Sequence, residues 1–76
     1  MSVVMMRTAL KAFVLQVKER EMRVCDCATL QEMLVHTGEA AGFCEGDRIC
    51  IEYSGNHLKG AFPQIRERQI CRITRF

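Results

Sequence analysis

The sequence predicts a small all-β domain with little helix, and three observations support this fold class. Residues 46–56 read as a turn, a strand and a second turn. Between these turns, apolar residues alternate with polar ones, a period of two that is typical of a strand with one buried face. Residues 7–18, the other apolar segment, have no helix N-cap beyond Thr8 and no glycine at their end to stop a helix.

Length and composition indicate one globular domain spanning residues 1–76, with residues 1–6 either a frayed leader or the start of the first strand. The chain is 49% hydrophobic and 26% charged, which is ordinary for a soluble globular protein. Arg7 and Lys11 interrupt the first apolar run, so no signal peptide is expected. No segment approaches the ~20 apolar residues of a membrane helix. With five cysteines, an odd count, these features predict a cytoplasmic protein with reduced thiols and no membrane association.

The first half of the chain predicts a three-stranded meander. The first strand is expected to be long and bulged over residues 7–18, because two strand phases are present and a bulge is what changes the phase. Phe13, Leu15 and Val17 fit one phase, and Leu10, Ala12 and Val14 fit the other. The remaining elements are a charged turn at 18–21, a strand at 22–27, a tight turn at 26–30 and a strand at 31–36.

The second half predicts two more strands joined by long connections. Residues 37–47 form a loop in which residues 39–41 make one helical turn and Phe43 closes the bottom of the core. In strand 48–53 the alternation buries Ile49, Ile51 and Tyr53 and exposes Arg48 and Glu52. A connection over 54–64 then leads to a last strand at 65–76, with Ile65, Ile70 and Ile73 as core candidates.

Three meander strands, a crossing loop and two further strands are the order of a five-stranded OB-type (oligonucleotide-binding) barrel. The segments Asp26…Thr29–Val35, Phe43–Gly55 and Phe62–Ile65 resemble small uncharacterised bacterial OB-fold-like proteins, over roughly residues 9–73. The resemblance implies the OB-like fold and carries no activity. Two features depart from it: Leu30 stands where such turns tend to carry glycine, and residues 56–62 lack the small and hydroxyl residues expected before the proline.

Cysteine spacing leaves a metal site open as one alternative. Cys25 and Cys27 are two residues apart on a predicted strand, so both side chains would lie on one face, and Cys44 and His36 would complete a zinc site. The competing interpretation is that cysteine packs as a small apolar residue. The spacing is not the Cys-x2–4-Cys of structural zinc sites, so no metal and no cofactor is predicted.

The sequence predicts that the protein is not an enzyme. Ser54 and His57 are close in sequence, but no third group is in reach to orient the histidine. Gly38, Gly42 and Gly46 are too widely spaced for a phosphate loop or a dinucleotide fingerprint.

Single-stranded nucleic-acid binding is the alternative that the predicted fold suggests, because OB barrels often have this function. It requires positive charge together with exposed aromatic side chains. The core pattern takes up Phe13, Phe43 and Tyr53, and Phe62 and Phe76 are free to be exposed. The candidate contact residues are Arg23, Arg48, Phe62, Arg66, Arg68 and Arg72.

Charge patterning does not favour this alternative over a solvated surface. The whole chain carries a net charge of +2, and its basic excess lies in residues 65–76, which contain four arginines and one glutamate. Glu21, Glu32 and Glu52 dilute the charge on the other strands. The sequence therefore predicts a small non-enzymatic binding or interaction module, monomeric or weakly dimeric, with a protein or nucleic-acid partner that it does not identify.

Overall fold

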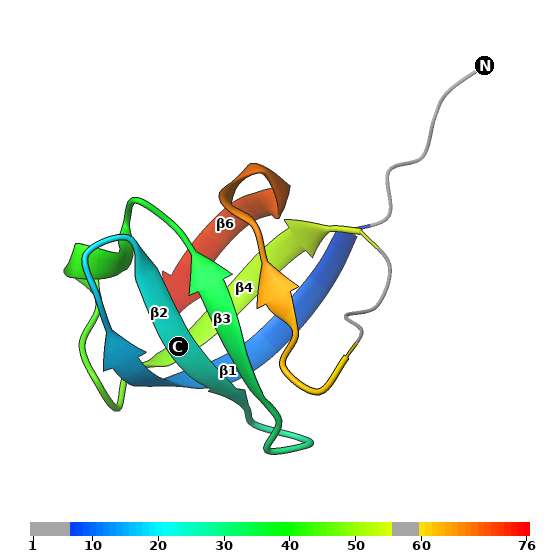
Figure 1. Cartoon of the computed structure of the whole chain (residues 1–76), viewed down its shortest axis with the longest axis horizontal. Helices are drawn as coiled ribbons and strands as arrows, with labels where there is room; N and C mark the ends of the chain where they lie inside the picture. Colours follow the sequence, from blue (N-terminus) through cyan, green and yellow to red (C-terminus); the bar gives the residue numbers. More distant parts are fainter. Residues whose placement is uncertain (1–6, 56–59) are drawn as a thin grey trace.

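The computed structural model describes residues 7–55 and 60–76, which form one six-stranded sheet (Figure 1). The strands are β1 (Arg7–Val17), β2 (Glu21–Asp26), β3 (Glu32–His36), β4 (Arg48–Ser54), β5 (Gln64–Ile65) and β6 (Ile70–Arg75). Two short 3₁₀ helices, η1 (Ala40–Gly42) and η2 (Glu67–Gln69), lie in the connections. The mainly β fold class is confirmed. The closed five-stranded barrel is not what the structure contains, because the sheet has six strands and is open.

The sheet order β5-β3-β2-β1-β4-β6 places β1 near the middle, between β2 and β4. All pairs are antiparallel except β3 with β5. Residues 7–17 are extended, as predicted, and the register with β2 shifts between Val14 and Gln16, where the chain has a bulge. The bulge lets one long strand pair first with β4 and then with β2, so the sheet can curl around its core.

Asp26 organises the turn between β2 and β3. Its side-chain Oδ1 accepts hydrogen bonds from the backbone N–H groups of Ala28 at 2.7 Å and Thr29 at 3.2 Å. Its backbone carbonyl accepts the N–H of Leu30 at 2.8 Å. Leu30 has a φ of +63°, a left-handed conformation that glycine adopts more readily. Leu30, which stands where such turns tend to carry glycine, therefore has a backbone conformation that disfavours leucine.

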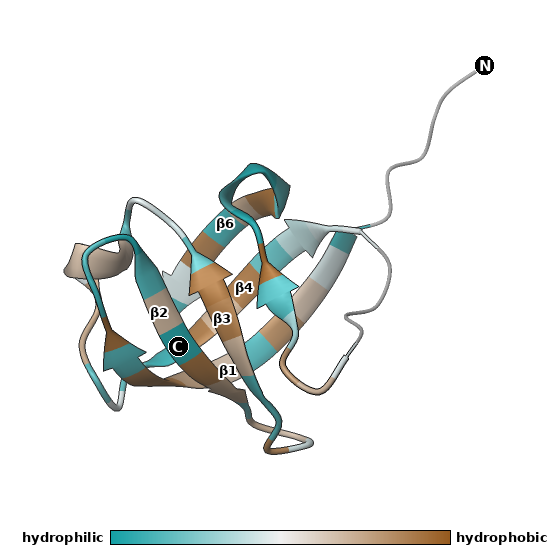
Figure 2. Cartoon of the chain, in the orientation of Figure 1, coloured by the Kyte–Doolittle hydropathy of each residue, from teal (hydrophilic) through white to brown (hydrophobic). Residues whose placement is uncertain are grey.

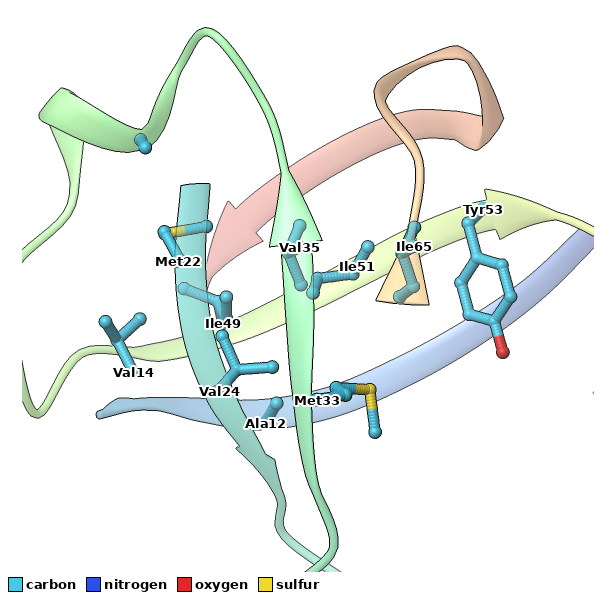
Figure 3. Packing of buried hydrophobic residues seen from close by; sticks show 11 residues of the cluster. Ala12, Val14, Met22, Val24, Met33, Val35, Ile49, Ile51, Tyr53 and Ile65 are labelled. Carbon is cyan, nitrogen blue, oxygen red and sulfur yellow. The ribbon is translucent and has the colours of Figure 1, made fainter. Parts of the chain in front are cut away.

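The core lies on the concave side of the sheet and takes buried residues from β1 to β5 (Figure 3), while Ile70 and Ile73 of β6 pack against it. On β4, Ile49, Ile51 and Tyr53 are buried and Arg48 is exposed, as the alternation predicted, whereas Glu52 is half-buried. The other buried members of the cluster are Ala12, Val14, Met22, Val24, Met33, Val35, Ala40 and Ile65. Figure 2 shows the complementary pattern, with hydrophilic residues gathered in the turn that carries η2.

Phe13 does not belong to this core, contrary to the prediction. Ala12 and Val14 on either side of it are buried, so the alternation directs Phe13 to the outer face, where it is half-buried. The phase that contains Leu10, Ala12 and Val14 is therefore the inner one, and Val17 rejoins it after the bulge.

The last predicted strand, 65–76, is broken in two. Residues 67–69 turn as η2, with the N–H of Gln69 bonded to the Arg66 carbonyl and the Arg66 N–H bonded to the Gln69 side chain at 2.9 Å. The short β5 pairs with β3, whereas β6 pairs with β4. The two edge strands of the sheet are thus consecutive in the chain.

The 37–47 loop is fixed to β6 by Asp47, Arg75 and Phe43. Asp47 Oδ2 accepts the Cys44 N–H at 2.8 Å and the Arg75 Nε–H at 3.1 Å. The Arg75 guanidinium lies 4.7 Å from the centre of the Phe43 ring and also donates to the Gly42 carbonyl. Phe43 packs against the core from this end, as expected.

The expectations for residues 1–6 and for residues 56–59, including His57, lie outside the described part of the chain. Within the described part, no helix is long and apolar enough to cross a membrane.

Candidate binding groove on the outer face

The outer face of β1, β2 and β3 presents side chains in rows set by the strand register. One row runs from Gln16 on β1 through Arg23 on β2 to Leu34 on β3, and then to Gln64 on β5. The next row along the strands carries Phe13, Cys25 and Glu32. Residues in a row lie on the same face and within contact distance of their neighbours.

A groove of about 180 Å³ crosses the first of these rows. Its lining residues are Gln16, Lys18, Glu21, Arg23, Leu34 and Phe62. Phe62 belongs to the connection that precedes β5, and its side chain is 43% exposed. The segment is held against β3 because the Leu34 N–H donates to the Pro63 carbonyl at 3.0 Å. The groove therefore combines an exposed aromatic ring with polar and charged side chains.

The charge of this groove is mixed. Arg23 donates to Gln16 Oε1 at 3.3 Å and lies 3.7 Å from a Glu32 carboxylate oxygen. Both ion-pair side chains are nearly half exposed, so water screens the pair and a ligand anion can compete for Arg23. Lys18 and Glu21 add one charge of each sign. The groove suits a ligand that needs one or two cationic contacts beside an aromatic surface.

Of the six residues predicted to contact nucleic acid, Arg23 and Phe62 lie together in this groove. Arg48 lies on the same outer face, next to Phe13 in the β1–β4 register. Arg72 is engaged elsewhere, with its guanidinium bonded to Glu52 at 2.7 Å. Arg66 and Arg68 are exposed at η2, beyond β5. The basic carboxyl-terminal segment therefore does not form one surface with the groove.

Phe13 is the residue of this face that sequence reasoning missed. It flanks Arg48 on one side and Cys25 on the other, so a second aromatic ring borders the row that contains Arg23. The signal was the phase of Leu10, Ala12 and Val14: Ala12 and Val14 are buried and Leu10 is partly buried, which turns Phe13 outward.

The structure does not bring the four proposed zinc ligands together. Cys25 is buried on β2, whereas Cys27 lies past the end of that strand and is exposed. Cys44 belongs to the turn before β4, and His36, at the end of β3, lies with its Nε2 2.9 Å from Gln64 Oε1. Within residues 7–55 and 60–76, no group of three histidine, cysteine, aspartate or glutamate side chains could hold a metal ion.

Cys25 behaves as a packing residue. Burial raises the pKa of its thiol, and the neighbouring Glu32 carboxylate raises it further. A thiol with a raised pKa stays protonated near neutral pH and is a poor nucleophile and metal ligand. The interpretation of Cys25 as a small apolar residue therefore fits its surroundings.

Ser54, which lies close to His57 in sequence, is engaged in holding β4 to η2. Its hydroxyl donates to the Gln69 carbonyl at 3.3 Å, and the Gln69 amide donates to the Ser54 carbonyl at 3.2 Å. These contacts give the serine a structural role in the described part of the chain.

Comparisons with protein-family models, with curated proteins and with solved structures found no match to this chain. The function has to be argued from the geometry of its own residues.

Proposed function

We propose that this chain is a small non-enzymatic binding module with an OB-like architecture. The pairing pattern supports this architecture, because β1 pairs with both β2 and β4 and because β3 pairs in parallel with the strand that follows β4. β5 forms one edge of the sheet and β6 forms the other. If the two are taken as one interrupted strand, that strand lies beside both β3 and β4. That arrangement is what a partly open five-stranded Greek-key barrel requires.

The ligand surface in this proposal is the groove on the outer face of β1–β3. The observation that carries it is the exposed Phe62 ring beside Arg23 and Lys18. OB-type barrels bind their ligands on the face of strands 2 and 3 and with the loops that flank it. Lys18 follows β1, and Phe62 precedes β5, so both belong to connections of that kind.

The ligand class that this chemistry suits is a short single-stranded nucleic acid. A base stacks on Phe62, and phosphates contact Lys18 and Arg23. Two phosphate contacts on a single strand predict a slope of log affinity against log salt of about −1.4. Binding is therefore expected to be weak and to fade at physiological salt.

Titration with octathymidylate and octauridylate, followed by two-dimensional amide NMR at two salt concentrations, tests the proposal. Amide shifts are expected at Gln16, Arg23 and Leu34. Phe62→Ala is expected to weaken binding by the ~1–3 kcal/mol that a stacked base contributes. Phe76→Ala is the matched control, because Phe76 is also an exposed aromatic but lies at the end of β6, near Lys11.

Two results would contradict the assignment. Equal weakening by Phe62→Ala and Phe76→Ala would mean that the groove is not the ligand surface. A submicromolar, salt-resistant complex would mean that stacking on more aromatic rings than this face offers dominates binding.

A further inference from the structure

β6 has an open edge that faces away from β4. It is the terminal strand of the sheet, and the Phe76 N–H donates to the Arg48 carbonyl at 3.0 Å. In an antiparallel ladder, hydrogen-bonded pairs alternate with pairs whose polar groups point away. In this register the pairs Thr74–Cys50 and Arg72–Glu52 are therefore bonded, and the N–H and C=O groups of Ile73 and Arg75 point to the open edge.

A second groove, of about 330 Å³, runs along this edge. Ile70 and Ile73 of β6 are half-buried in it and pack against the core. Its other walls come from the loop around η1 and from η2, through Thr37, Glu39 and Glu67, and Cys71 and Arg72 of β6 complete the lining. The edge thus offers backbone donors and acceptors beside a partly apolar surface, which is the requirement for adding a strand.

The two charged side chains of β6 are each paired with a carboxylate. Sheet edges are commonly blunted by charged side chains that repel another strand. On β6, however, Arg72 is bonded to Glu52, and Arg75 is bonded to Asp47 and lies over Phe43. Arg72 is thus paired with β4, while also lining the groove, and Arg75 is paired with the 37–47 loop.

The wall opposite β6 is acidic. Glu39 is exposed and forms no ion pair with any residue in the described part of the chain. Glu67 is 57% exposed, pairs with Arg20 at 3.4 Å and accepts the Gly38 N–H at 3.1 Å. A lysine or arginine on an incoming strand would therefore meet complementary charge.

The wall that contains Glu39 and Glu67 favours a single peptide, rather than a second copy of this chain, as the occupant of the groove. A second copy pairing through its own β6 would bring its β4 behind that strand, into the space that η1 and Glu67 border. A single extended segment needs only the ~4.8 Å spacing of one added strand.

We propose that the open edge of β6 binds an extended basic peptide of a partner protein by strand addition. The peptide backbone pairs with Ile73 and Arg75. Apolar side chains on one of its faces cover Ile70 and Ile73, and a basic side chain contacts Glu39. This site is separate from the groove on β1–β3, so it stands or fails independently of the proposed nucleic-acid ligand.

The test uses a capped heptapeptide of alternating valine and lysine as the probe, and its valine–glutamate counterpart as the matched control. Amide NMR is expected to show shifts at Ile73 and Arg75 and slowed hydrogen exchange of the Ile73 amide with the lysine peptide. Glu39→Lys is expected to weaken the lysine peptide about threefold to tenfold, because an exposed ion pair is replaced by like charges. No shift at these amides with millimolar lysine peptide, or equal binding of both peptides, would overturn the proposal.

A backbone variant separates strand addition from simple charge attraction. Ile73→Pro removes an N–H that points to the open edge and leaves the hydrogen bonds to β4 in place. It is expected to abolish peptide binding while the amide spectrum of β1–β3 stays folded. Unchanged binding by a folded Ile73→Pro protein would overturn the proposal. If that variant unfolds, the Glu39→Lys comparison and the glutamate peptide still decide the question.

Discussion

Ile51 is completely buried at the middle of β4, between Ile49 and Tyr53 on the inner face. We expect Ile51→Ala to lower the free energy of unfolding by about 2–5 kcal/mol, through lost apolar contact and the cavity left behind. Urea unfolding measures this directly. The matched control is Thr74→Ala on the paired strand, which is exposed and should change stability by less than about 0.5 kcal/mol. Equal effects of the two substitutions would contradict the placement of Ile51.

Leu30 combines an exposed apolar side chain with a left-handed backbone. Its φ is +63° and its side chain is 68% exposed, so substitution removes little packing. The left-handed conformation costs an ordinary residue about 1–2 kcal/mol, and glycine avoids this cost. Glycine lowers the stability by about 0.5–1 kcal/mol, however, because it loses more conformational entropy on folding. We therefore expect Leu30→Gly to be neutral or to stabilise the fold by up to about 1.5 kcal/mol.

A substitution of Leu30 by a β-branched residue should have the opposite effect to Leu30→Gly. Leu30→Val should destabilise the protein, because a branched Cβ tolerates the left-handed region least. Thermal unfolding of both variants checks the pair. A more stable valine variant than glycine variant would mean that this turn does not hold Leu30 in the left-handed region.

At the scale of elements, the contact between the 37–47 loop and β6 should make stability depend on pH. The Cys44 N–H hydrogen bond lowers the pKa of Asp47 below its ordinary value of 3.8, and Arg75 lowers it further, against an opposing effect of burial. A carboxyl whose pKa is lower in the folded state stabilises the fold above its unfolded pKa and loses this contribution as pH falls through the folded pKa.

We expect the free energy of unfolding to fall on acidification below about pH 4, and to fall less in Asp47→Asn. The asparagine can still accept the Cys44 hydrogen bond but has no proton to gain in this range. Urea unfolding at a series of pH values measures both slopes. Identical slopes for the two proteins would show that Asp47 is not among the carboxylates that set acid stability.

β1 shows what periodicity can and cannot predict for one element. The change of phase correctly indicated an extended, bulged strand, because a period of two is a local property of the chain. Which phase faces inward depends on the partner strands: Ala12 lies against Ile49 of β4 and Val14 against Val24 of β2. The apolar pattern alone placed Phe13 in the core, and that prediction was wrong.

For the whole molecule, the meander and the alternation on β4 could be predicted because both depend on neighbouring residues. The break of the last strand could not, since η2 is held to β4 by the two hydrogen bonds between Gln69 and Ser54, which join segments 15 residues apart. The groove was predictable only in part for the same reason. Arg23 and Phe62 are far apart in sequence, and only the pairing of β2 with β3, and of β3 with β5, brings them together.

One continuous core also predicts how the molecule unfolds. The buried cluster takes residues from β1 to β5, and the two half-buried isoleucines of β6 pack against it, so no strand has a core of its own. Small domains of this kind usually unfold in one cooperative transition. Tyr53 is the only tyrosine in a chain without tryptophan and is buried, so its fluorescence reports on the core alone.

We expect urea unfolding curves from Tyr53 fluorescence and from far-ultraviolet circular dichroism to coincide. Ile65→Ala, in the two-residue β5, should move both midpoints together and cost about 2–5 kcal/mol, because Ile65 is fully buried and joins the carboxyl-terminal segment to the rest of the core. If Ile65→Ala instead shifted the circular dichroism curve and left the tyrosine curve unchanged, residues 64–75 would be a separately melting segment. That segment carries both edges of the sheet, so its separate melting would also remove the open edge of β6 as a stable platform for an added strand.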